Sequence, residues 1–277
     1  MSVIKTIMLL FEFLCLLSIA SAENYINSGK DWEGLCKTGH IQSPINLKSS
    51  DADFIEKDSA ISSSLSLEFL LAASTGLFTN TSYQLLGNFG GVILGTGKND
   101  EIKLFSTKIE LHSPSEHYIQ DKQFDLEMQI FLSDGETDEF SYILSVFYQE
   151  SNQTSKFLKD VIESEGKTLK IDVGNAFESI EKIYNFYFYE GSYTVPPCTE
   201  DIGWLIWPQI QKMDKPQHDF FSSQWQNNTD FAEGNGNNRE IQAPGSRIII
   251  YFDGVDKLSS TSLLFLLPSS FYFMLYF

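Results

Sequence analysis

Histidine is scarce in this chain, and its scarcity limits the metal chemistry that the chain can support. The 277 residues contain four histidines: His40, His112, His117 and His218. Imidazole is the most common metal ligand among protein side chains. A metal site built from three histidines would therefore have to use three of these four.

Cysteine usage points to one cross-link. Cys15 lies in an apolar N-terminal run, which leaves Cys36 and Cys198 in the body of the chain. In an oxidising compartment, an isolated pair is expected to form one disulfide, and the alternative is two free thiols. The bond would close a loop of about 160 residues, for which chain entropy gives an upper value of about 5 kcal/mol.

Composition excludes several classes of function. The chain has 37 acidic and 19 basic residues, a net charge of −18. This balance argues against a nucleic-acid binder, which needs a basic patch, and against electrostatic attachment to anionic lipid. Apolar residues make up 42%, including 23 Phe, which is enough for a large core and excludes disorder.

The N-terminus has the layout of a secretory signal peptide. Lys5 precedes an apolar run, and Ala20-Ser21-Ala22 forms a small-residue cleavage site, so we expect residues 1–22 to be removed. The alternative is an N-terminal membrane anchor.

The C-terminus ends in a second apolar segment, 263–277, in which twelve of fifteen residues are apolar. It is shorter than the roughly 20 residues that span a bilayer. A polar stretch of small residues precedes it, which fits a GPI-attachment signal over 255–277, with Gly254 leaving a spacer of suitable length. The alternative is a short uncleaved anchor.

The expected mature domain, 23–254, contains three N-x-S/T sequons, at Asn80, Asn152 and Asn227. In an exported protein these are candidate glycosylation sites on surface loops.

Short apolar or alternating runs between Gly, Asn, Asp and Ser predict a chain made mostly of strands. The predicted strands are 83–86, 91–94, 102–105, 108–112, 124–131, 140–147, 183–189, 204–207 and 247–252. Helical spacing is confined to 155–165 and 209–221. No internal repeat or long linker interrupts the pattern, so we expect one mainly β domain.

Five motifs, in order, resemble those of the α-class carbonic anhydrases. They are QSPINL at 42–47, IELHSPSEH at 109–117, FDLEMQI at 124–130, EGSYTVPPCTE at 190–200 followed by Trp204, and NNR at 237–239. The resemblance covers about residues 24–252. It implies a central, mostly antiparallel twisted sheet of about ten strands with small peripheral helices. The Cys36–Cys198 pair also matches the disulfide of secreted members.

The resemblance implies a zinc ion held by three histidines, two of them two residues apart on one strand and the third on its neighbour. Zinc held in this way lowers the pKa of bound water to near 7 and so supplies hydroxide for CO₂ hydration. The matching positions here are Glu110, His112 and Gln129, so one histidine remains. A carboxylate can ligate zinc, whereas a neutral carboxamide is a poor ligand. We therefore expect no resident cofactor; zinc in a weakened His/Glu/Gln site is the alternative.

The remaining site matches the family in part. Thr194 and Glu116 match the gatekeeper hydroxyl and the carboxylate that orients it. The CO₂ pocket maps to Phe131, Ile143, Tyr193, Ile202 and Trp204, in which Phe131 and Tyr193 are larger than the usual Val and Leu. The proton-shuttle histidine of the family falls near 87–89, where this chain has none.

The metal ligands, the CO₂ pocket and the proton shuttle implied by the family resemblance are therefore all altered in this chain. The sequence predicts a ligand-deficient relative of carbonic anhydrase without significant hydratase activity. It would lie outside the cell, secreted or lipid-anchored to the membrane, and act as a binding or structural module for an unidentified protein partner. The rival interpretation is a weakly active carbonate dehydratase.

Overall fold

The computed structural model describes residues 24–55, 65–70, 73–79, 83–97, 100–135, 140–177, 182–225, 228–229 and 232–253. The predicted signal peptide 1–22, the tail 255–277, Gly254 and the sequons at Asn80 and Asn227 lie outside these residues. The third sequon, at Asn152, lies in an exposed bend.

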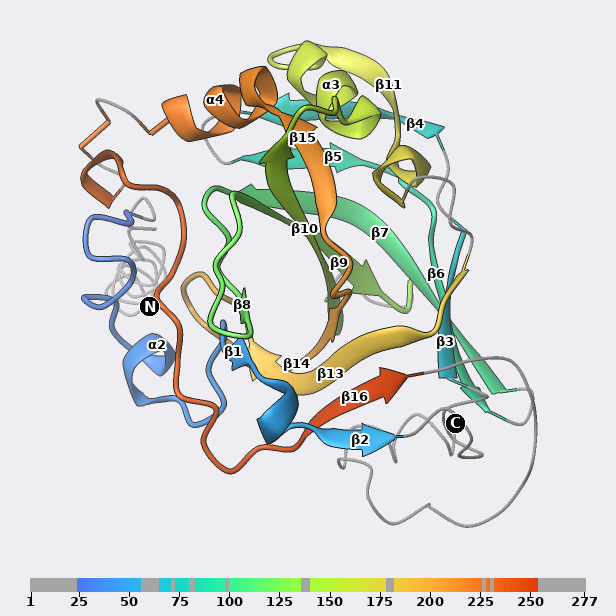
Figure 1. Cartoon of the computed structure of the whole chain (residues 1–277), viewed down its shortest axis with the longest axis vertical. Helices are drawn as coiled ribbons and strands as arrows, with labels where there is room; N and C mark the ends of the chain where they lie inside the picture. Colours follow the sequence, from blue (N-terminus) through green and yellow to red (C-terminus); the bar gives the residue numbers. More distant parts are fainter. Residues whose placement is uncertain are drawn as a thin grey trace, which may run out of the picture.

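One twisted sheet dominates the described structure (Figure 1). Its main path contains ten strands, the number that the family resemblance implies, and four more strands join it at the side. Along the main path the order is β11 (Thr168–Asp172), β4 (Ala73–Thr79), β5 (Gln84–Gly87), β7 (Asp100–His112), β9 (Leu126–Ser133), β10 (Tyr142–Ser151), β14 (Glu200–Ile206), β13 (Asn185–Ser192), β16 (Ile249–Asp253) and β2 (Asp53–Ile55).

The four additional strands are β3 (Leu65–Phe69), β6 (Gly91–Gly97), β12 (Lys182–Ile183) and β15 (Gln211–Asp214). Strand β10 pairs in parallel with both β14 and β15, and β16 pairs in parallel with β2. The other pairings in this sheet are antiparallel, so the predicted mixed but mostly antiparallel sheet is confirmed. A separate parallel pair joins β1 (Asn46–Leu47) to β8 (Tyr118–Ile119).

Helices are few and short. The described ones are α2 (Leu35–Thr38), α3 (Lys156–Glu163) and α4 (Lys215–Ser223), with 3₁₀ turns η1 (Ser49–Asp51), η2 (Val173–Phe177) and η3 (Ala232–Gly234). Figure 1 shows α3, α4 and β11 gathered at one end of the sheet. Among the described residues, no helix is long and apolar enough to cross a membrane.

The helix predicted over 155–165 is confirmed as α3, whereas the one predicted over 209–221 is wrong in its first half. There the chain forms β15 and pairs with β10, from Tyr148 opposite Gln211 onwards. The helix starts only after Asp214, whose carboxylate accepts the backbone N–H of Gln217 while the Gln217 side chain accepts from the Asp214 N–H. This capping box, with Pro216 in the first turn, sets the start of α4.

The central strand β9 is buried on both faces, and the two faces have different characters. Leu126, Met128 and Ile130 belong to the larger apolar core. Glu127 and Gln129, on the opposite face, are also fully buried, next to Phe131. Since side chains alternate along a strand, the sheet itself separates the apolar core from a buried polar site.

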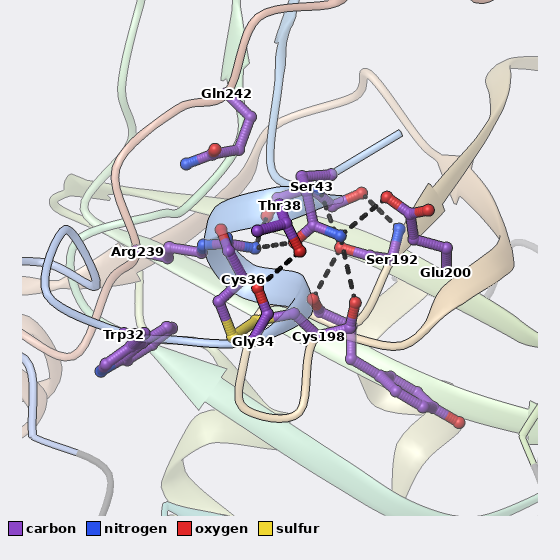
Figure 2. Close-up of a disulfide and its surroundings, with 12 residues drawn as sticks. Trp32, Gly34, Cys36, Thr38, Ser43, Ser192, Cys198, Glu200, Arg239 and Gln242 are labelled. Carbon is purple, nitrogen blue, oxygen red and sulfur yellow. Dashed lines mark hydrogen bonds between the residues drawn. A yellow bond between two sulfur atoms is a disulfide. The ribbon is translucent and has the colours of Figure 1, made fainter. Parts of the chain in front are cut away.

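A disulfide joins Cys36 of α2 to Cys198 in the loop before β14, as predicted, across a sequence separation of 162 residues. Figure 2 shows Arg239 reaching the same helix. The Arg239 guanidinium donates to the carbonyl oxygens of Cys36 and Ser43, each at 2.7 Å, and to Oε1 of Gln42 at 3.0 Å. The disulfide and the Arg239 hydrogen bonds therefore hold the N-terminal segment against two parts of the chain that are distant in sequence, around Cys198 and Arg239.

Candidate functional site

The three predicted ligand positions lie together on one face of two neighbouring strands. Glu110 and His112 are on β7, and Gln129 is on β9 directly opposite Glu110. His112 lies opposite Glu127 in the same register. All four residues are at most 5% exposed. The structure thus brings together the three side chains that the motif spacing singles out, namely a carboxylate, an imidazole and a carboxamide.

His112 is oriented like a metal-binding histidine. Its Nδ1 lies 2.8 Å from the carbonyl oxygen of Asn237. A carbonyl oxygen can only accept, so Nδ1 carries a proton and Nε2 faces the site. Nε2 is buried and has no hydrogen-bond partner among the described residues.

Glu110 is held by two donors that the motif analysis did not identify. Its Oε1 accepts hydrogen bonds from Nε2 of Gln84 at 2.7 Å and from Nζ of Lys108 at 3.0 Å. Its Oε2 lies 3.8 Å from Nε2 of His112, which is an ion-pair distance and too long for a hydrogen bond.

These neighbours keep Glu110 ionised. Burial by itself favours the neutral acid, but the nearby His112 and the positive charge of Lys108 lower the pKa of Glu110 to about 2. Burial also disfavours the imidazolium of His112, whereas the charges of Glu116 and Glu110 favour it and raise the pKa of His112 to about 10. Without a metal, the two groups therefore favour a carboxylate beside a protonated imidazole, and a metal ion at Nε2 of His112 would have to displace that proton.

Gln129 is fixed by two carboxylates. Its Nε2 donates to Glu116 at 2.8 Å and to Glu127 at 3.2 Å. An amide nitrogen has two hydrogens and no acceptor capacity, so these bonds decide the orientation of the side chain. They leave Oε1 buried, without a hydrogen-bond partner among the described residues.

Glu127 is the centre of the polar network behind these residues. Its Oε2 accepts the backbone N–H groups of Glu116 and His117, and its Oε1 accepts from Ser145 and lies 2.8 Å from Nδ1 of His117. The other ring nitrogen of His117 lies 2.6 Å from the hydroxyl of Tyr189. Although burial opposes ionisation, His117 and Ser145 lower the pKa of Glu127 to about 2. His117 is thus part of a structural network and is not a replacement ligand.

The predicted gatekeeper pair is also brought together. Thr194 is buried, and its side chain is one of the groups that lower the pKa of Glu116. Glu116 accepts hydrogen bonds from Gln129 and, at 2.9 Å, from the backbone N–H of Arg239. Burial raises the pKa of Glu116 above its ordinary value, against the opposing charge of His112.

The residues of the predicted apolar pocket lie in one cluster of large apolar side chains. Ile143, Ile202 and Trp204 are buried there with Phe131, and Tyr193 packs against them. The rings of Phe131 and Tyr193 are stacked at 6.0 Å between centroids. The Tyr193 hydroxyl donates to the carbonyl oxygen of Phe140, which fixes the ring in place.

Lys108 connects the filled pocket to the ligand positions. Its Nζ lies 3.8 Å from the centroid of the Phe131 ring while it pairs with Glu110. A cation over an aromatic face is attracted by the electron density of the ring. Lys108 therefore places a positive charge and a four-carbon chain beside the position where a metal and its substrate would lie.

These residues do not fit a zinc ion. The candidate donors are one imidazole nitrogen, one carboxylate that already accepts from an ammonium and an amide, and one neutral amide oxygen. Zinc prefers thiolate, imidazole and free carboxylate ligands, and a neighbouring ammonium opposes a divalent cation. Among the described residues, no group of three or more His, Cys, Asp or Glu side chains is arranged to hold a metal ion.

Two contributors were absent from the motif analysis, namely Lys108 and Gln84. The position of Lys108, two residues before Glu110 on a predicted strand, could have indicated that the two side chains share a face. Gln84 gives no such signal, because its contact depends on the pairing of β5 with β7, in which Gln84 lies opposite Glu110.

Comparisons with known proteins identify relatives of the chain as a whole. The carbonic anhydrase of Neisseria gonorrhoeae is 26% identical over 234 residues, covering 83% of this chain and 84% of that protein. Dioscorin DB3L of Dioscorea polystachya is 28% identical over 189 residues, which is 66% of each chain.

Among solved structures, the α-carbonic anhydrase of Thermovibrio ammonificans in complex with the inhibitor sulfanilamide has the same fold. The TM-score is 0.60 at 22% identity, covering 78% of this chain and 89% of the other. The sequence profile described as eukaryotic-type carbonic anhydrase matches residues 27–253. The motifs, the sheet and the assembled site thus have one explanation: the chain belongs to the α-class, eukaryotic-type carbonic anhydrase family.

Proposed function

We propose that this protein is a carbonic anhydrase relative without significant CO₂ hydratase activity, which acts outside the cell as a binding or structural module for a protein partner. The observation that carries the proposal is the half-buried Lys108 beside the buried Glu110 and His112. Members of this family normally depend on zinc. Here an ammonium lies 3.0 Å from the carboxylate at a ligand position and supplies a positive charge there.

The filled pocket supports the same conclusion independently of the metal. Phe131 is 2% exposed and lies against Tyr193, which is itself fastened to the backbone of Phe140. A rigid aromatic pair at these positions reduces the space for CO₂ beside the metal site. Restoring the ligands alone should therefore restore binding of the metal more fully than catalysis.

The direct test is to measure zinc and CO₂ hydration in purified protein prepared without added metal. We expect well under one equivalent of zinc and no hydration above the uncatalysed rate. Tightly bound zinc near one equivalent, together with measurable hydration, would overturn the proposal.

A rescue experiment separates the ligands from the pocket. Glu110→His with Gln129→His should recover about one equivalent of zinc if the scaffold is intact. Adding His112→Asn to this double variant is the matched control and should abolish the recovered binding. Substantial activity in the double variant, without Phe131→Val and Tyr193→Leu, would refute the pocket argument.

One observation favours the rival function, a weakly active carbonate dehydratase. Nε2 of His112 and Oε1 of Gln129 are both buried and lack partners among the described residues. A metal ion with a mixed His/Glu/Gln coordination would satisfy both atoms. Zinc-dependent hydration that is lost in His112→Asn would establish this function.

We also propose that the protein is exported and held on the outer face of a membrane. The disulfide fits an oxidising compartment, and its formation supports export. Phosphatidylinositol-specific phospholipase should release the mature protein from membranes. Retention after this treatment, with Phe277 still present by mass spectrometry, would replace the lipid anchor by a short membrane-spanning segment.

A further inference from the structure

A polar cavity of about 290 Å³ lies where β10, β15, α3 and η2 meet. Figure 1 shows these elements near the end of the sheet that carries the helices. None of the residues that line the cavity belongs to the candidate site described above. A cavity of this size is at the lower end of the range for small-ligand sites.

The charge of the cavity is opposite to that of the protein as a whole. Lys156 and Lys212 both line it, and none of its lining residues is acidic. The complete chain has 37 acidic and 19 basic residues. The two lysines give the lining a positive charge in a protein of net charge −18, while Asp160 lies near Lys156 and Asp214 accepts from Thr154.

The neutral groups of the cavity add hydrogen-bond donors. Lys156 donates from Nζ to Oδ1 of Asn175 at 3.3 Å, which orients the amide of Asn175. Nδ2 of Asn175 is buried and has no hydrogen-bond partner among the described residues. A buried amide N–H without an acceptor is costly, so this side of the lining is polar and incompletely satisfied.

The start of α3 contributes a favourable field. Ser155, which lines the cavity, caps this helix by accepting the N–H of Leu158 at 3.2 Å. The first turn of α3 contains no acidic residue to neutralise the positive end of the helix dipole. Thr154 also lines the cavity and donates its hydroxyl to Asp214, a carboxylate that caps α4 and lies outside the lining.

We propose that this cavity binds a phosphate or sulfate group, either as the free ion or attached to a sugar-sized molecule. Lys156 and Lys212 would contact the oxyanion. The exposed amide of Gln153 would contact hydroxyl groups of an attached sugar-sized molecule.

Titration calorimetry with inorganic phosphate, glucose 6-phosphate and glucose tests the proposal at constant ionic strength, since salt screens exposed charges. We expect saturable binding of at least one of the two anions, with a Kd at or below about 1 mM, and none of glucose. Tighter binding of glucose 6-phosphate than of phosphate would identify an attached phosphate as the ligand group, and equal binding would identify the free ion.

The variant Lys156→Gln with Lys212→Gln should weaken anion binding by about tenfold or more, because each lysine provides a charge-assisted hydrogen bond. Lys159→Gln is the matched control, because it removes the same charge from the same helix outside the cavity. It should change the Kd by less than about twofold. All three lysines are exposed, so the variants should fold, which thermal melting verifies.

Three results would overturn the proposal. They are the absence of saturable binding by either anion, an unchanged Kd in the double variant, and an equal loss of affinity in Lys159→Gln.

Discussion

Replacing Arg239 with Met should destabilise the whole domain, although Arg239 lies outside the ligand positions. The side chain is 1% exposed, and its guanidinium donates to Cys36, Ser43 and Gln42. Met has a similar length but no donors. The substitution therefore keeps most of the packing and removes the hydrogen bonds.

The size of the effect follows from the acceptors that are left behind. The carbonyl oxygens of Cys36 and Ser43 would lose a buried partner, and each loss costs about 1–3 kcal/mol. Part of this cost is offset, because burial disfavours the charged guanidinium and lowers the pKa of Arg239. We expect a net loss of about 3 kcal/mol in the free energy of unfolding, or about 6–12 °C in Tm for a domain of this size.

The assay is urea denaturation followed by tryptophan fluorescence and near-UV circular dichroism, with the disulfide intact. Arg247→Met is the matched control. Arg247 also donates to three carbonyl oxygens, but two of them, in Pro244 and Ala243, belong to its own loop, and its side chain is less buried. A loss of less than about 1 kcal/mol in Arg239→Met, or an equal loss in both variants, would refute this reasoning.

The other predictions concern the disulfide, the loss of stability at acidic pH and the glycan at Asn152. Reduction of Cys36–Cys198 should lower Tm markedly, by up to the equivalent of about 5 kcal/mol, and an unchanged melting curve in strong reductant would contradict this. Burial would raise the pKa of Glu200, but bonds from Gln42 and from the Ile41 N–H lower it below its ordinary value. The ionised Glu200 therefore stabilises the fold above about pH 4.5, and this contribution is lost as the pH falls. In urea titrations at decreasing pH, the free energy of unfolding of Glu200→Gln should fall less steeply than that of the wild type. Identical pH profiles would exclude this role. Asn152 is exposed, so an N-glycosidase should shift the mass of the exported protein by one glycan more than in Asn152→Gln, and equal shifts would show that this sequon is unused.

The error over 209–221 shows where sequence patterns were insufficient. The apolar residues Ile210 and Met213 fit helical spacing, but Met213 is buried within a strand that pairs with β10. Parallel pairing depends on a partner more than 60 residues away, which no local pattern contains. The start of α4 was readable, because Asp214, Pro216 and Gln217 are the residues of a capping box with proline in the first turn.

The sequence by itself determined which residues occupy the ligand positions, which cysteines pair and that the domain is mostly β. The ligand positions follow from motif spacing and the strands from alternation, which are local properties, whereas the cysteine pair follows from the number of cysteines in the body of the chain. The tertiary structure decided what the substituted residues do. Glu110 lies opposite Gln84 on β5, 26 positions earlier, and Gln129 donates to Glu116, which lies in the loop after β7. Hydrogen bonds and ion pairs act over a few ångströms, so the partners of a buried side chain depend on strand register and loop paths, which exist only in the folded chain.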